Sequence, residues 1–152
     1  MNELLLMAHV SFGVLCLLAT VWVFVDTLQA SETNLERIKW LSRLAASAMW
    51  LAFLVGGWWY VTLYPADKAI ILKGPWPFAH NLFMETKEHL VILLLLLTTY
   101  LPIVAADNLA TNKAARKLTL WVAALIVLLA LTMEGEGAFI AMGVKVALLA
   151  GK

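Results

Sequence analysis

Four long stretches of predominantly apolar residues dominate the pattern along the chain, at about 4–25, 44–64, 82–106 and 118–141. Each is about 20 residues or longer, the length that an α-helix needs to cross the hydrocarbon core of a lipid bilayer. The connectors between them hold most of the charged residues. This pattern predicts an all-α integral membrane protein that folds in the lipid bilayer as an antiparallel four-transmembrane-helix bundle.

The connector between the second and third stretches differs from the other two in composition. It holds three of the four prolines of the chain, and its segment AIILKGPWPF combines apolar and aromatic residues with one lysine. Since proline and glycine interrupt a long helix, we expect only a short interfacial helix here, near 68–76, along the membrane surface. The sequence shows no repeat and no low-complexity linker. Residues 1–152 are therefore expected to form a single transmembrane domain.

Composition and charge support the membrane assignment and exclude some classes of partner. Hydrophobic residues make up 63% of the chain and charged residues 14%, whereas soluble domains are about half apolar and about a quarter charged. The net charge of +1 speaks against a nucleic-acid partner, which selects for a basic surface. Cys16 is the only cysteine, so one chain can form neither a disulfide nor a multi-cysteine metal motif.

The distribution of lysine and arginine predicts the orientation. These residues are most frequent in the first and third connectors, at Arg37, Lys39, Arg43, Lys113, Arg116 and Lys117. Positive residues favour the cytoplasmic side of a membrane, so we expect both termini on the outer side of a bacterial cytoplasmic (inner) membrane. The N-terminal stretch lacks the basic region and cleavage site of a signal peptide, and is expected to remain as the first helix.

Three ionisable side chains on three helices share one depth in this arrangement. His9, His89 and Glu134 each lie about 17 residues, or about 26 Å, from the cytoplasmic end of their helices. Gly56 and Gly57 lie near the same level on the second helix. Ionisable groups inside a membrane are energetically costly and usually face the bundle interior or a wet cavity. The coincidence predicts a buried site in the outer leaflet.

One interpretation of this level is a haem site. His9 and His89 would be the axial ligands of one haem b between the first and third helices, since imidazole is a common haem ligand and bundle cores hold cofactors. Gly13, one turn inward of His9, would leave room for the macrocycle, and Gly56 and Gly57 would thin the wall of the second helix. The chain would then be a membrane-embedded redox or electron-transfer protein.

Aromatic residues at the outer ends of the helices suggest a partner for such a protein. They gather at Trp58, Trp59, Tyr60, Tyr64 and Trp76. Aromatic rings favour the headgroup region of a membrane, where this cluster could line an entrance for quinol.

Two further interpretations remain open. His9, Glu85, His89 and Glu134 could form a non-haem site for copper, iron or zinc. Imidazole and carboxylate together suit iron and zinc, and copper if a nearby methionine joins them. Alternatively, the chain has no cofactor and is an accessory subunit beside other membrane subunits, or a small transporter that forms a homo-oligomer.

The sequence also leaves a choice between two neighbouring carboxylates. Glu134 and Glu136 point to nearly opposite sides of a regular helix, and we expect Glu134 to face the interior and Glu136 to face outward. His80, at the start of the third helix, is expected at the surface.

Overall fold

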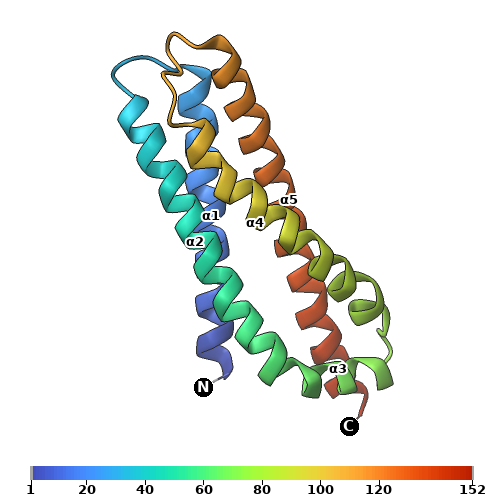
Figure 1. Cartoon of the computed structure of the whole chain (residues 1–152). Helices are drawn as coiled ribbons and strands as arrows, with labels where there is room; N and C mark the ends of the chain where they lie inside the picture. The colour runs from blue at the N-terminus through green and yellow to red at the C-terminus, as the bar shows by residue number, and fades with distance from the viewer. Residues whose placement is uncertain (1, 152) are drawn as a thin grey trace.

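The computed structural model describes residues 2–151, and all regular structure within them is helical (Figure 1). The elements are α1 (Asn2–Leu28), α2 (Leu35–Thr62), α3 (Tyr64–Lys73), the π-helix η1 (Ala79–Met84), α4 (Glu85–Val104) and α5 (Lys113–Ala150). Helices α1, α2, η1 continued by α4, and α5 are each long and apolar enough to cross a membrane. The all-helical class and the four apolar helices are therefore confirmed.

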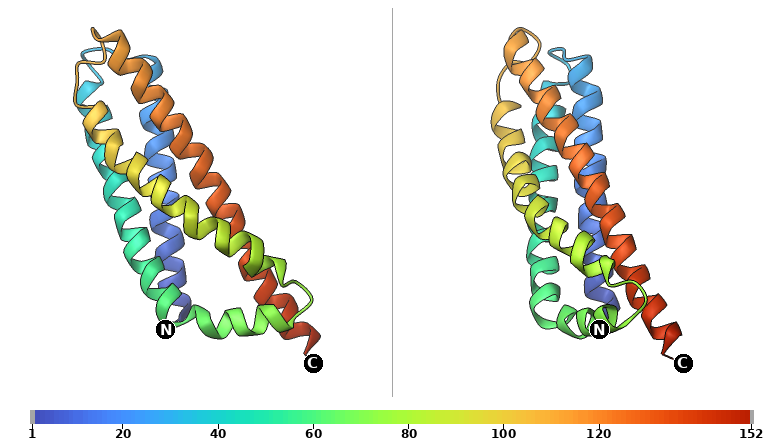
Figure 2. Two further views of the ribbon diagram at one scale, coloured as in Figure 1. Left: turned by 45° about the vertical axis from the view of Figure 1, so that its right-hand side comes forward. Right: turned by 90° about the vertical axis from the view of Figure 1, so that its right-hand side faces the viewer.

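The four long helices lie lengthwise against one another (Figures 1 and 2). Helix α1 packs against α2 and α5, and α4 packs against α5 and α2. Both ends of the chain lie at the end of the molecule where α3 runs across the long helices (Figure 1). The same end holds η1, which packs against α3, α4 and α5.

The short helix of the middle connector is present but begins earlier than the predicted range of 68–76. Helix α3 spans Tyr64–Lys73, with Pro65 in its first turn, where the missing N–H leaves no hydrogen bond unmade. It ends before Gly74, which is unfavourable in a helix, and Pro75, which has no N–H to donate to the helix.

Helix α5 is longer than the predicted 118–141 because its last turns pack against α3 and η1. A Cβ atom added at Gly143 would lie 2.5 Å from the Cβ of Ala79, and one added at Gly74 would lie 2.5 Å from the Cβ of Ala147. Glycine at these two positions permits a backbone approach that any other residue would obstruct. Residues 142–150 are also apolar apart from Gly143 and Lys145, so the predicted end at 141 was too early.

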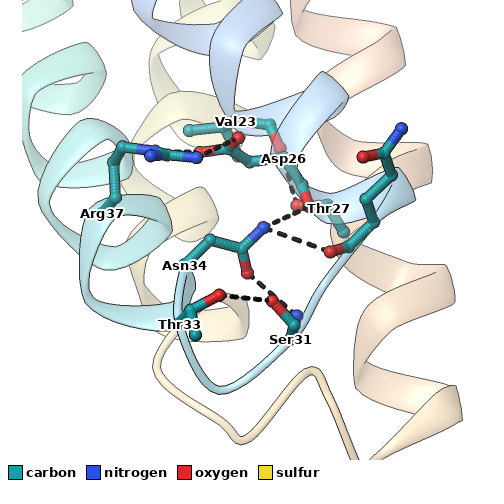
Figure 3. A network of polar contacts seen from close by, with 8 residues as sticks. Val23, Asp26, Thr27, Ser31, Thr33, Asn34 and Arg37 are labelled. Carbon is teal, nitrogen blue, oxygen red and sulfur yellow. Dashed lines mark hydrogen bonds and ion pairs between the residues drawn. The ribbon is translucent and has the colours of Figure 1, made fainter.

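The end of the molecule opposite α3 is held by polar contacts between connectors and helix ends. Arg37 donates two hydrogen bonds to the Asp26 carboxylate, of 2.6 and 2.7 Å. The Asn34 amide donates to the carbonyls of Asp26 and Gln29, and its Oδ1 accepts from the Ser31 amide at 2.9 Å (Figure 3). These bonds satisfy carbonyl groups that a helix end leaves without partners.

Two separate clusters of buried apolar residues form the core. The larger joins α1, α2, α4 and α5 and reaches as far as Met133, whereas the smaller contains Tyr64, Ile71, Ala79, Met84 and Ile140. Large apolar side chains such as those of Trp22, Leu54 and Leu128 are exposed on the outer surface.

Candidate functional site

A cavity of about 510 Å³ lies between the long helices at the end that carries α3. Its walls are largely apolar and aromatic, and include Phe53, Trp59, Met84, Met133 and Ile140. Its polar lining residues come from four helices, at His9, Tyr60, Asp67, Lys87 and Glu88. An apolar pocket of this size with a few convergent polar groups is typical of a ligand site.

His9 of α1 is held against α2 beside the cavity. Its Nδ1 lies 2.8 Å from the carbonyl oxygen of Ala52, which can only accept, so Nδ1 carries the hydrogen and donates it. In the neutral ring, Nε2 is then left as an acceptor. A Cβ atom added at Gly56 would lie 2.5 Å from Nδ1, so the imidazole packs directly on this glycine.

Lys87 of α4 reaches across to α5. Its Nζ donates to the carbonyl oxygen of Met133 at 3.0 Å and lies 2.9 Å from where a Cβ atom at Gly137 would be. Gly137 therefore leaves the space that the ammonium group occupies. Within residues 2–151, Lys87 forms no ion pair with a carboxylate.

The two carboxylates of α5 face different neighbours, and the expectation that Glu136 is the outward one was wrong. Glu136 is only 6% exposed, and its Oε2 has no hydrogen-bond partner in the described part of the chain. Glu134 is partly buried and points at α1, where its Oε1 occupies the space beside Gly13. Helix α5 lies between α1 and α4, so opposite faces of this helix both meet the interior.

The structure does not bring His89 to His9. His89 is exposed, and its Nδ1 donates to the backbone carbonyl of Glu85 one turn earlier, at 2.6 Å. The Glu85 side chain is also exposed, and neither residue lines the cavity. Of the residues singled out in the sequence, those that line the cavity are His9, Gly56, Gly57, Trp59 and Tyr60, whereas Gly13 lies against Glu134.

The donors proposed for a metal are likewise dispersed. Among residues 2–151, no group of three or more His, Cys, Asp or Glu side chains could hold a metal ion. The space that Gly13 was expected to leave for a macrocycle holds the Glu134 carboxylate instead.

A buried Tyr–His pair next to the cavity was not anticipated, and the expectation of a surface His80 was wrong. Tyr64 and His80 are 1% and 3% exposed, and the Tyr64 hydroxyl lies 2.9 Å from Nδ1 of His80. Burial raises the pKa of the Tyr64 phenol, so its O–H stays protonated and can donate. His80 lies in η1, which packs against α5, α4 and α3, and its partner Tyr64 is the first residue of α3.

Tyr60, Asp67 and Glu88 are the remaining polar residues that line the cavity, and with His9 and Lys87 they form its polar rim. The Tyr60 hydroxyl donates to Oε1 of Glu88 at 2.6 Å, and its ring stacks on Tyr64 with centroids 5.4 Å apart. Burial raises the pKa of the Asp67 carboxyl. The aromatic cluster in the sequence was the signal for this rim, although it did not indicate which rings turn inward.

No protein-family model, no curated protein and no solved structure significantly matches the chain.

Proposed function

We propose that the chain is an integral membrane protein that binds a quinol-type ligand in the cavity beside His9 and takes part in electron transfer. Its four long helices form an antiparallel bundle in a bacterial cytoplasmic membrane, with both termini and α3 on the outer side. The observation that carries this proposal is the cavity itself, which combines apolar walls with hydrogen-bonding groups from several helices.

Membrane insertion is supported by the surface of the helices. Large apolar side chains, among them Leu54, Leu96 and Leu128, are more than half exposed. In water such a surface would be strongly unfavourable, because each square ångström of exposed apolar area costs about 25 cal/mol. In a lipid bilayer the same apolar surface contacts hydrocarbon instead of water, so this cost does not arise.

The chemistry of a quinol fits the cavity in two respects. A quinol has an apolar tail and a ring with two hydroxyl groups, and the cavity offers apolar and aromatic walls with a polar rim. The free Nε2 of neutral His9 can accept a hydrogen bond from a ring hydroxyl. A volume of about 510 Å³ lies within the range of about 300–1,000 Å³ that is usual for small-molecule sites.

Haem b on His9 and His89 is not part of this proposal, because His89 is exposed and directed to its own backbone. Copper, iron or zinc held by His9, Glu85, His89 and Glu134 is left out for the same reason. We propose instead that the redox centre that exchanges electrons with the quinol belongs to another membrane subunit or to a second copy of the chain.

The test is binding of a short-chain benzoquinol to the full chain in lipid nanodiscs, measured by calorimetry. His9→Phe removes the acceptor nitrogen and should weaken binding about five- to tenfold, since one hydrogen bond contributes about 1 kcal/mol. His89→Phe is the matched control and should bind like the wild type. Equal affinities of the two variants, or no binding by the wild type, would refute the proposal.

Two simpler measurements test its remaining parts. Single cysteines placed in the 29–34 and 105–112 connectors should react with an impermeant thiol reagent only from the cytoplasmic side, and one placed in α3 only from the outside. An absorption spectrum of the purified protein should lack a Soret band, and its presence would restore the haem interpretation.

A further inference from the structure

Glu136 of α5 is a buried acidic residue whose carboxyl group is not fully hydrogen-bonded within residues 2–151. It is 6% exposed, and its Oε2 accepts no hydrogen bond within the described residues. Met133 and Ile140, one turn away on either side along α5, are also buried and belong to the larger and the smaller apolar cluster respectively. The carboxyl group therefore lies at the junction of two apolar regions, where an ionised group without a partner is strongly unfavourable.

The charged groups that face Glu136 are few. Lys87 approaches from α4, and it interacts electrostatically with both Glu134 and Glu136. Glu134 lies on the same helix but faces α1, and its charge acts on both Lys87 and His9. Lys87 is thus the one cation among these four groups that can neutralise an ionised Glu136.

Lys87 is not bonded to Glu136 in the structure. Its ammonium donates to the carbonyl of Met133, three residues before Glu136 on α5. Residues three apart on a helix are neighbours on its surface, so a rotation of the lysine side chain carries Nζ from this carbonyl to the carboxyl group. The observed bonding pattern suits a neutral, protonated Glu136, which needs no cationic partner.

We propose that Glu136 and Lys87 form a buried proton-binding site. When Glu136 holds a proton, Lys87 donates to the Met133 carbonyl; when the proton leaves, the Glu136 carboxylate accepts a hydrogen bond from Lys87 instead. The proton exchanges through the cavity, because Lys87 and Gly137 line it and Gly137 is adjacent to Glu136 in the chain. The proposal does not depend on the identity of the ligand in the cavity.

The test is infrared difference spectroscopy on the full chain in lipid nanodiscs during steps of pH. Wild-type protein should show the C=O stretching band of a protonated carboxylic acid in an apolar environment. Glu136→Gln should lose this band, whereas Glu134→Gln, the matched control on the same helix, should keep it. A band that survives Glu136→Gln, or that disappears only in Glu134→Gln, would overturn the proposal.

A second variant keeps the test decisive if Glu136→Gln does not fold. Lys87→Met removes the cation that stabilises the ionised carboxylate, so the band should persist to a pH higher by about one unit or more. A purely structural lysine would leave the pH dependence of this band unchanged. An unchanged midpoint in Lys87→Met would therefore also refute the proton-binding site.

Discussion

Adjacent glycines on α2 offer a sharp test of how His9 is held. Gly56 and Gly57 both lie inside a regular helix and are both partly exposed. A Cβ atom at Gly56 would meet Nδ1 and Cε1 of His9 at 2.5 and 2.6 Å, whereas a Cβ atom at Gly57 would meet nothing within 4 Å. The two Gly→Ala substitutions therefore differ in packing but share the same change in helix propensity.

The expected difference in the free energy of unfolding follows from three contributions. Alanine is favoured over glycine in a helix by about 1 kcal/mol, which stabilises both variants equally. Gly56→Ala also forces the imidazole away, at about 1–3 kcal/mol for overpacking, and breaks its hydrogen bond to Ala52, at about 1 kcal/mol. Gly57→Ala should thus be slightly more stable than the wild type, and Gly56→Ala should be less stable than Gly57→Ala by about 2–4 kcal/mol.

The assay is reversible unfolding of each variant by SDS added to mixed micelles, followed by circular dichroism. Benzoquinol binding to folded Gly56→Ala gives a second readout, because displacement of His9 should also weaken ligand binding. Equal stability of the two alanine variants would refute the contact between Gly56 and the His9 ring. It would also remove the reason for assigning the acceptor role to Nε2.

Three further predictions concern polar groups outside the His9 contact. Tyr64→Phe leaves Nδ1 of buried His80 without its partner and should lower the free energy of unfolding by about 1–3 kcal/mol, measured by the same SDS titration. Burial raises the folded-state pKa of Asp67, so ionisation of this carboxyl group opposes folding. The free energy of unfolding therefore falls as pH rises from the unfolded-state pKa of Asp67 through its folded-state pKa. The thermal midpoint of Asp67→Asn should therefore exceed that of the wild type at neutral pH and converge with it in acid; a gap that widens in acid would contradict this. Asn34→Ala breaks three hydrogen bonds of the 29–34 connector and should lower the thermal midpoint clearly more than Thr33→Ala, whose exposed side chain bonds only to that of Ser31.

The four long helices could be predicted from the sequence because their signal is local. A run of about 20 apolar residues is sufficient to indicate a helix that can cross a membrane, whatever its neighbours are. The shared depth of His9 and Gly56 was also available from counting along the helices, and the structure places these two residues in contact.

The direction in which each side chain points was not available from the sequence. His89 was expected inside and is exposed, while Glu136 and His80 were expected outside and are buried. In a soluble helix the period of apolar positions identifies the inner face. A helix surrounded by lipid is apolar on both faces, because the solvent itself is apolar, so this period carries little information.

Packing between particular residues decides these orientations instead. The approach of Gly143 to Ala79 sets α5 against η1. Gly137, also on α5, leaves room for the ammonium group of Lys87 from α4. Rotating α5 about its axis to turn Glu136 outward would lose both contacts. The sequence by itself therefore determined which segments are helices and how far along each helix its polar residues lie. Only the tertiary structure decided which of these residues meet, since small residues far apart in the chain control how closely the helices approach.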